Sequence, residues 1–300
     1  MTEKAAAPTR REHVPLGIAY MIGATILFSA AGAITKWAVA TYPVGEVGFI
    51  RQVVSTLLCA AMIMPRTGFA VFRTQRLGAH AMRGFSQFTS QMCLIIALTM
   101  LPLGAAMSIS FSAPLFAVLI AVVLYRERVG LYRGIALLVG FVGVLLITEP
   151  RSGGVEFGTV FALLNAIIYA SVTVAVRRMS ATESADTLTM YQMVALLVLM
   201  ASLLPLGFVT PTPADLGLLA LCGVSNGLGQ FWWTKALSLA PAPAIMPFYY
   251  LSLAWAIGFG FVIWGDVPTR ALLIGAAVIV VSGLYLIWRE TLERRRLAAR

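Results

Sequence analysis

Charged residues are scarce in this sequence. Aspartate, glutamate, lysine and arginine make up 11% of its 300 residues, whereas they make up about 25% of an ordinary soluble domain. Hydrophobic residues account for 60%. Because so few polar side chains cannot cover a core that faces water, the composition excludes a soluble globular protein. We therefore expect lipid to surround most of the chain.

Cysteine and histidine are also few, with three cysteines and two histidines. Cys59, Cys93 and Cys222 lie inside apolar runs without CxxC spacing, which favours small buried side chains over a disulfide or a metal site. The sequence contains no phosphate-binding loop of the GxxxxGKS/T type, no HExxH and no GxSxG motif. We therefore predict neither an ATP-driven pump nor an enzyme, and neither a cofactor nor a metal.

Long apolar runs recur along the chain, separated by short segments that contain proline, glycine or charge. Each run is close to the roughly 20 residues that a helix needs to cross a bilayer. Strands of a membrane barrel alternate apolar and polar residues, which these runs do not. We therefore predict an all-α integral membrane protein with ten transmembrane helices, near Pro15–Thr35, Val44–Met64, Met82–Met100, Gly104–Tyr125, Gly130–Ile147, Phe157–Val176, Thr187–Phe208, Leu216–Ala236, Pro243–Trp264 and Ala271–Trp288.

Positive charge is distributed unequally between the two sides of these ten spans. Of the 22 lysine and arginine residues, only Lys36, Arg151 and Arg270 fall on one side, and Arg51 falls inside a span. By the positive-inside rule both termini are cytoplasmic. Membrane topology thus explains the net charge of +10 better than a nucleic-acid partner does. The partners that we expect are a small-molecule substrate and the lipid bilayer, with no obligate protein partner.

The sequence contains an internal repeat. A shift of 141 residues aligns the run from Leu16 with the run from Phe157, and a shift of 139 aligns the run from Ala97 with that from Ala236. Each copy holds five predicted helices, an odd number, so the second copy enters the membrane from the opposite side. We predict two inverted halves, residues 1–148 and 149–300. Such repeats are typical of alternating-access transporters with a site at their interface, and the alternative is a duplicated scaffold without transport.

Polar residues form two stripes within the predicted spans. One face of the third span carries Arg83, Gln87, Ser90 and Gln91, and one face of the eighth carries Asn226, Gln230 and Thr234. The amides in these stripes are Gln87 and Gln91, and Asn226 and Gln230. Under the 139-residue shift they are repeat mates, so we predict that the stripes face each other across a central cavity and bind substrate. The alternative is that these amides join helices by hydrogen bonds. Asn165 adds a polar position on the sixth span.

Aromatic residues supply further predicted substrate contacts. Tyr249 and Tyr250 lie inside the ninth span, and Phe111 is the repeat mate of Tyr250. Tyr169 follows Asn165 by one turn, and Trp233 lies near the end of the eighth span. Aromatic faces suit flat or apolar substrates, although tryptophan and tyrosine also gather at membrane interfaces.

Among the acidic residues, only Glu46 lies within a predicted span, close to its start. No aspartate or glutamate lies near the middle of a predicted span, so coupling to protons has no evident carrier. Arg51 lies about two turns into the second span, and a spacing of five from Glu46 makes a poor helical pair. We predict a gating or structural role for Arg51, with a substrate contact as the alternative.

The stretch from Pro114 to Ile147 resembles the drug/metabolite transporter superfamily in its EamA form with two halves, through Pro114, Glu127, Gly134 and Gly143. The resemblance covers about Leu16 to Trp288, and Arg51 looks like the arginine usual in the second span. In the second half, Leu253 stands where a proline would repeat, with Pro247 nearby, and Asp266 stands for the glutamate. We count Pro114, Pro247, Glu127 and Asp266 as gating or structural residues, and we expect the kink in the ninth span to sit at a different height.

Within the superfamily the chain is most similar to the bacterial aromatic amino-acid exporters of the YddG type. The residues and the resemblance together predict a secondary transporter of the bacterial cytoplasmic membrane that exports small neutral amphipathic metabolites. Aromatic and hydrophobic amino acids are the predicted substrates, and the direction of transport comes from the resemblance alone. The alternatives are export of other small metabolites or lipophilic drugs, and a membrane scaffold that transports nothing.

Overall fold

The computed structural model describes residues 13–125, 131–148, 156–180, 182–240 and 242–298, so the predicted site residue Glu127 lies outside the described residues. Within these ranges the regular structure is helical, without strands. The helices are α1 (Val14–Ala38), α2 (Val44–Thr67), η1 (Gly68–Phe72), α3 (Leu77–Met100), α4 (Leu103–Ser110), α5 (Ala113–Tyr125), α6 (Leu131–Thr148), α7 (Phe157–Met179), α8 (Ala185–Ala201), η2 (Leu204–Leu206), α9 (Pro213–Leu239), α10 (Ala242–Tyr249), α11 (Leu251–Trp264) and α12 (Arg270–Ala298).

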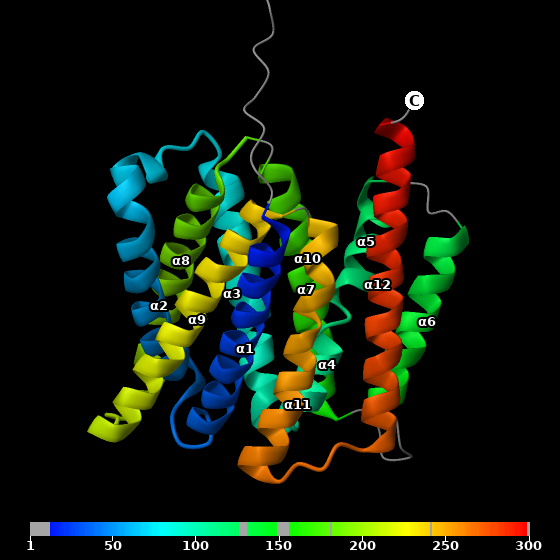
Figure 1. The fold of residues 1–300 in the computed structure, drawn as a ribbon. Coiled ribbons are helices and arrows are strands. Elements are labelled where there is room, and N and C mark those ends of the chain that lie inside the picture. Colours follow the sequence, from blue (N-terminus) through cyan, green and yellow to red (C-terminus); the bar gives the residue numbers. More distant parts are fainter. Residues whose placement is uncertain (1–12, 126–130, 149–155, 181, 241, 299–300) are drawn as a thin grey trace, which may run out of the picture.

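The helices form one bundle with two distinct ends (Figure 1). α1 begins and α12 finishes at the same end, which is at the top of Figure 1 and is called the terminal end below. The other end is called the opposite end. α1 runs away from the terminal end, whereas its repeat mate α7 runs toward it. The two copies of the repeat therefore have opposite directions in space, as the odd number of helices per copy requires.

Many contacts between helices occur twice, once between two helices and once between their repeat mates. α1 packs along α9 as α7 packs along α3, and α2 contacts α9 as α8 contacts α3. Two further contacts, α2 with α8 and α6 with α12, join corresponding helices directly. This pattern is the one that a repeat with pseudo-twofold symmetry produces. The boundary between residues 148 and 149 stays a prediction.

Glycines let the helices of this bundle approach closely. A Cβ atom at Gly223 of α9 would lie 2.8 Å from the backbone oxygen of Arg51 and 2.5 Å from Val54 Cβ, both on α2. At the crossing of α6 and α12, a Cβ on Gly143 would lie 2.9 Å from the oxygen of Gly275. Since any side chain would push the backbones apart, small residues set the helix spacing here, as they commonly do in membranes.

The fourth and ninth predicted spans are each broken into two helices. α4 ends at Ser110 and α5 begins at Ala113, while α10 ends at Tyr249 and α11 begins at Leu251. Phe111 and Tyr250 are repeat mates whose ring centroids lie 5.7 Å apart, so the two breaks lie at the same height, and the expectation of different heights is wrong. The reason is that proline disturbs a helix on both sides of itself. Pro114 follows its break, whereas Pro247 precedes its break, where the Tyr250 N–H donates to the Pro247 oxygen at 3.3 Å.

The seventh predicted span also differs from the structure. The expected helical range ran to Phe208, but α8 ends at Ala201 and a short 3-10 helix follows at Leu204–Leu206. The physical reason is Pro205, which has no N–H to donate to the Ala201 carbonyl.

Seven helices or joined helix pairs among the described residues are long and apolar enough to cross a membrane, and Gly134–Ile147 is a shorter apolar helix. The chain is thus a multi-pass membrane protein by its composition and helix lengths. The helices α3 and α9 are not among the seven, and these are the helices that carry the two polar stripes. The total of ten spans and the cytoplasmic location of the termini stay predictions.

Candidate functional site

One wall of the candidate site is the contact between α3 and α7. Asn165 Nδ2 donates to the backbone oxygen of Ser90 at 2.8 Å and to its Oγ at 2.9 Å. Because the two helices run in opposite directions (Figure 1), Gln87 and Tyr169 lie at the same level, one turn closer to the terminal end. Gln91 Nε2 is buried and has no hydrogen-bond partner within the described residues. Asn165 therefore joins two helices, whereas Gln91 keeps an uncommitted donor.

Tyr169 shows that there is open space inside the bundle. Its phenol interacts electrostatically with Arg83 of α3 and with Tyr249 of α10, so it faces the bundle interior. The side chain is nevertheless 36% exposed. An exposed phenol that faces other helices must border a cavity, and helices from both halves of the chain surround this one.

Arg83 lies one turn beyond Gln87 on α3 and is only 5% exposed. Its Nη1 donates to the Leu188 oxygen at 2.8 Å, and its Nη2 donates to Gln192 Oε1, both on α8. Its Nε is buried without a partner among the described residues. The sequence places Arg83 on the same stripe as Gln87 and Gln91, but it was not predicted to contact substrate.

Aromatic rings gather where the fourth and ninth spans are broken. The ring of Phe111 lies 5.3 Å from that of Tyr249 and 5.7 Å from that of Tyr250, between centroids. The Tyr250 hydroxyl points at α12, where a Cβ on Gly283 would lie 1.9 Å from it. Trp233 and Tyr249 both pack against the apolar cluster around Met21 and Ala236. Tyr249 thus lies between this cluster and Phe111, while Tyr250 packs against α12.

On α9, as at the contact of α3 with α7, an asparagine joins two helices while a glutamine side chain is left without a partner among the described residues. Asn226 Nδ2 donates to Ser55 Oγ at 3.0 Å, and Ser55 Oγ donates to the Gly223 oxygen at 2.8 Å, which ties α9 to α2. The side chain of Gln230 is half-buried and makes no hydrogen bond to another described residue. Both asparagines thus make the interhelical bonds of the alternative interpretation, while substrate binding by Gln87, Gln91, Asn165, Asn226 and Gln230 stays a prediction.

The opposite end of the bundle is closed by Lys36, near the end of α1. Its Nζ donates to the oxygens of Leu101 and Leu98 at 2.5 and 3.4 Å, at the end of α3. The same ammonium lies 5.5 Å from the ring centroid of Trp264 and interacts with Asp266, just after α11. Asp266 Oδ2 is buried and accepts no hydrogen bond from the described residues. Lys36 therefore links three helix ends, one of which belongs to the second half.

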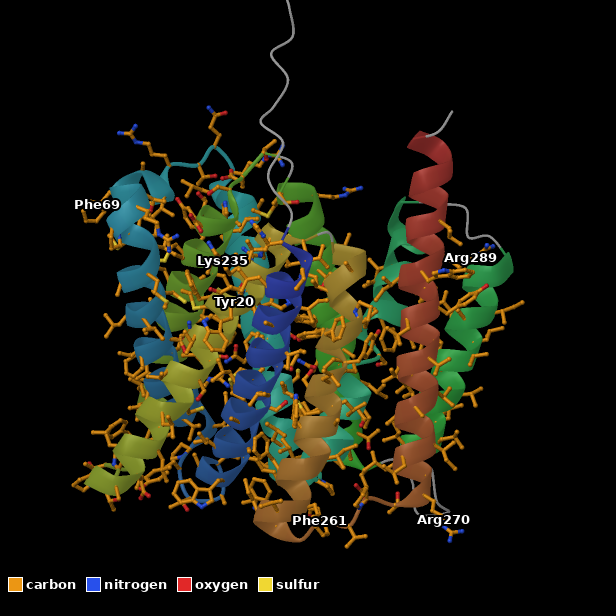
Figure 2. All side chains as sticks on the ribbon, in the orientation of Figure 1. Tyr20, Phe69, Lys235, Phe261, Arg270 and Arg289 are labelled. Atoms are coloured by element: carbon orange, nitrogen blue, oxygen red, sulfur yellow. The ribbon has the colours of Figure 1, made fainter. Side chains whose placement is uncertain are left out.

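The two ends are packed differently around α1 and α7. α1 contacts α3 and α4 near the opposite end, but their repeat mates α7 with α9 and α7 with α10 make no comparable contact in the described part of the chain. A cavity of about 310 Å³ lies between α2, α8 and α9. Figure 2 shows Lys235, one of its residues, in the terminal half. The lining residues are Cys59, Ile63, Arg66, Ala185, Asp186, Thr189, Phe231, Thr234 and Lys235.

The remaining predicted gating residues lie outside this cavity. Arg51 is 8% exposed, its Nη1 donates to Thr35 Oγ1 at 3.3 Å, and it interacts with Cys222 of α9. Glu46 does not pair with Arg51 but accepts the Val209 N–H at 2.8 Å. Pro114 and Pro247 flank the two helix breaks. A structural role for Arg51 agrees with these contacts, and its gating role stays a prediction.

A second interaction at the opposite end lies outside the membrane-spanning segments. Tyr42, in the loop after α1, donates its hydroxyl to Asp215 Oδ2 at 2.5 Å, and Thr212 Oγ1 donates to the same oxygen at 2.8 Å. These bonds lower the pKa of the Asp215 carboxyl, and the carboxylate in turn raises the pKa of Tyr42.

Comparison with known proteins gives one family and several relatives that extend over nearly the whole chain. The sequence model of the EamA-like transporter family matches residues 15–149 and 156–289. A riboflavin transporter of Rhizobium johnstonii is 27% identical over 298 residues, which is 98% of this chain and 97% of the relative. The pseudopaline exporter CntI of Pseudomonas aeruginosa is 30% identical, over 89% and 94%. An S-adenosylmethionine uptake transporter of Rickettsia conorii is 26% identical, over 91% and 93%.

A solved crystal structure has a similar fold, with a TM-score of 0.61, 22% sequence identity, and coverage of 94% of this chain and 98% of its own. The arrangement of helices described above thus occurs in a protein of known structure. The relatives carry chemically different solutes in both directions.

Proposed function

This chain belongs to the EamA-like transporter family, and we propose that it carries a small neutral solute with an aromatic ring by alternating access through the central cavity. It is a multi-pass membrane transporter of small molecules and not an enzyme. The proposal concerns the solute and the direction: aromatic and hydrophobic amino acids, exported across the bacterial cytoplasmic membrane, with both chain termini in the cytoplasm.

The observation that carries the proposal is the group of rings around the cavity. Phe111 and Tyr249 are in contact at the two helix breaks, and Tyr169 interacts with Tyr249 from the other side. Aromatic surfaces of this kind favour a flat solute, which they contact by stacking. The uncommitted amides of Gln91 and Gln230 supply hydrogen bonds to a polar solute group without adding charge.

The unequal packing of the two ends supports alternating access. At the opposite end Lys36 of α1 binds the end of α3, whereas at the terminal end α7 makes no comparable contact with α9 or α10 in the described ranges. In an inverted repeat, exchanging the conformations of the two halves exchanges the open and the closed end. With the terminal end in the cytoplasm, the structure corresponds to the state that receives solute from inside the cell.

Riboflavin is a second candidate solute. A relative that matches this chain over nearly its whole length is a riboflavin transporter, and the flat ring system of riboflavin suits the same aromatic group. This candidate differs from an amino acid in a testable way, because riboflavin carries no carboxylate and no ammonium group.

The test is uptake of labelled tryptophan and of labelled riboflavin into proteoliposomes that contain the purified protein. We expect saturable, protein-dependent tryptophan uptake that unlabelled phenylalanine inhibits and that an imposed pH gradient does not change. Uptake of riboflavin without uptake of tryptophan would favour the second candidate. The absence of flux for both would contradict an aromatic solute, and empty liposomes provide the control.

A further inference from the structure

We propose that Arg83 and Tyr169 form a subsite for a carboxylate of the transported solute. The inference rests on the proposed function, because it assigns one end of the solute to one part of the same cavity. It also narrows the solute class, since it requires an aromatic ring and a carboxylate in one small molecule.

Arg83 is a buried cation without an acidic partner. No carboxylate forms an ion pair with it within the described part of the chain. Glu183, which precedes α8, instead accepts a hydrogen bond from Thr74 at 2.6 Å and lies 3.9 Å from His80. A buried charge normally has a partner, and one inside a membrane protein marks a functional site by default. An anion that arrives with the solute would supply the missing partner.

The guanidinium also has donors to spare. It carries five N–H groups, and described residues accept from it at only two atoms, the Leu188 oxygen and Gln192 Oε1. Both acceptors are neutral and lie on α8. The buried Nε is among the uncommitted donors. The contacts to α8 thus fix the position of the guanidinium, and its charge is left without compensation.

Tyr169 connects this charge to the cavity. Its phenol interacts electrostatically with Arg83, while more than a third of its side chain is exposed to the interior space. A phenol can donate to a carboxylate oxygen, and a guanidinium behind it strengthens the attraction for an anion. Tyr249 interacts with Tyr169 and contacts Phe111. A solute whose carboxylate faces Arg83 therefore places its ring against Tyr249 and Phe111.

Arg51 provides the matched control for Arg83. It is also a buried arginine with an unpartnered Nε and without an acidic partner among the described residues. It differs because its neighbours are Thr35 and Cys222 in the packed contact between α1, α2 and α9, where no exposed phenol borders a cavity. A structural effect of removing a buried guanidinium should appear at both positions, whereas recognition of a carboxylate should depend only on Arg83.

The experiment measures how well unlabelled indole compounds compete with labelled tryptophan for binding to the purified protein, and separately for uptake into proteoliposomes. The two probes are indole-3-propionate, which keeps the carboxylate, and tryptophanamide, which lacks it. For the unmodified protein we expect indole-3-propionate to compete on the order of tenfold better than tryptophanamide. In Arg83→Gln this ratio should fall to about one, and in Arg51→Gln it should stay unchanged.

Several outcomes would overturn the subsite. The two probes could compete equally well with the unmodified protein, or Arg83→Gln could weaken both probes by the same factor, as a structural role predicts. If Arg83→Gln does not fold, Tyr169→Phe replaces it, and we expect about a threefold loss of the ratio. Binding that depends on the carboxylate but without uptake would contradict the proposed transport and leave the subsite standing. Uptake that does not depend on the carboxylate would contradict the subsite and leave the proposed transport standing.

Discussion

At the opposite end of the bundle α1 contacts α3 and α4, whereas at the terminal end the corresponding helix α7 makes no comparable contact with α9 or α10 among the described residues. The two ends are built from corresponding elements of the repeat, so the difference lies in how the elements are placed. Symmetry in the sequence together with asymmetry in the packing is what an alternating-access cycle needs.

The residues that link the helices at the opposite end have repeat mates near the terminal end. Under the 141-residue shift Lys36 corresponds to Arg177, and under the 139-residue shift Leu98 and Leu101 correspond to Leu237 and Ala240. One end of the bundle can therefore be altered by mutation while the other end serves as the reference.

Replacing Lys36 with methionine should have the largest effect. The variant loses two bonds to carbonyls and the interaction with Asp266, and bonds to charged groups typically contribute about 1.5–3 kcal/mol each. We expect a shift of the population of closed opposite ends by tenfold or more and a matching drop in transport. The measurement is labelling of Met107→Cys by a membrane-impermeant maleimide in a background without the native cysteines, since Met107 lies at the contact of α1 and α4.

Arg270→Met is the control for this change, because Arg270 is an exposed basic residue at the same end (Figure 2). It should leave labelling and transport as they are. Equal labelling of the Lys36→Met variant and its parent would show that Lys36 does not hold the opposite end closed.

The glycine pair Gly223 and Gly84 should show the next largest effect. They are repeat mates, and a Cβ at Gly223 would meet a backbone oxygen at 2.8 Å, whereas one at Gly84 would meet the Ala195 Cβ at 2.5 Å. We expect Gly223→Ala to lower the free energy of unfolding by about 1–3 kcal/mol, and Gly84→Ala by less, because Gly84 contacts α8 in the half of the bundle nearer the terminal end. Thermal unfolding in detergent measures both.

Gly217→Ala is the reference for the glycine changes, since nothing lies within 4 Å of a Cβ at this position of α9. It should leave the melting temperature unchanged or raise it slightly, because alanine favours a helix. A larger loss at Gly84 than at Gly223 would contradict the proposed difference between the ends.

The two amides on α9 should separate binding from packing. Gln230→Ala removes an uncommitted side chain, so we expect transport to fall severalfold while the melting temperature stays the same. Asn226→Ala removes the bond to Ser55, and a membrane-buried hydrogen bond is worth about 0.6 kcal/mol on average. That variant should melt at a lower temperature and transport nearly normally when folded. If Gln230→Ala lowered the melting temperature and Asn226→Ala lowered transport instead, the interpretation of the stripe would be wrong.

Tyr42→Phe should have the smallest effect, confined to the opposite end and dependent on pH. The lowered pKa of Asp215 means that this bond stabilises the fold above the ordinary aspartate pKa, and that its contribution disappears as the pH falls through the folded-state pKa. The raised pKa of Tyr42 has the reverse sign: its contribution is present below the ordinary tyrosine pKa and is lost as the pH rises through the raised value. Melting temperatures of both proteins should differ slightly at neutral pH and converge in acid. A constant difference would contradict the assignment.

Patterns within single helices were sufficient to predict part of this fold. Apolar runs predicted where most helices lie, and the polar stripes indicated α3 and α9. The predicted height of the break in the ninth span was wrong. The sequence shows Pro247 but does not show whether the helix breaks before or after it. Asn165 and Gln91 look alike in sequence, and only the position of Ser90 decides which amide is engaged. Arg83 was visible on the stripe, but its lack of a partner is a property of the assembled bundle.

The acceptors that hold Lys36 are the backbone oxygens of residues 98 and 101. A substitution changes a side chain and leaves the carbonyl in place, so no single replacement at Leu98 or Leu101 deletes the acceptor itself. The two sides of this contact consequently respond differently to mutation. A single substitution removes the ammonium of Lys36, whereas the two backbone oxygens remain after any substitution. A saturation scan of this end should therefore show intolerance concentrated at position 36, with hydrophobic exchange permitted at its two partners.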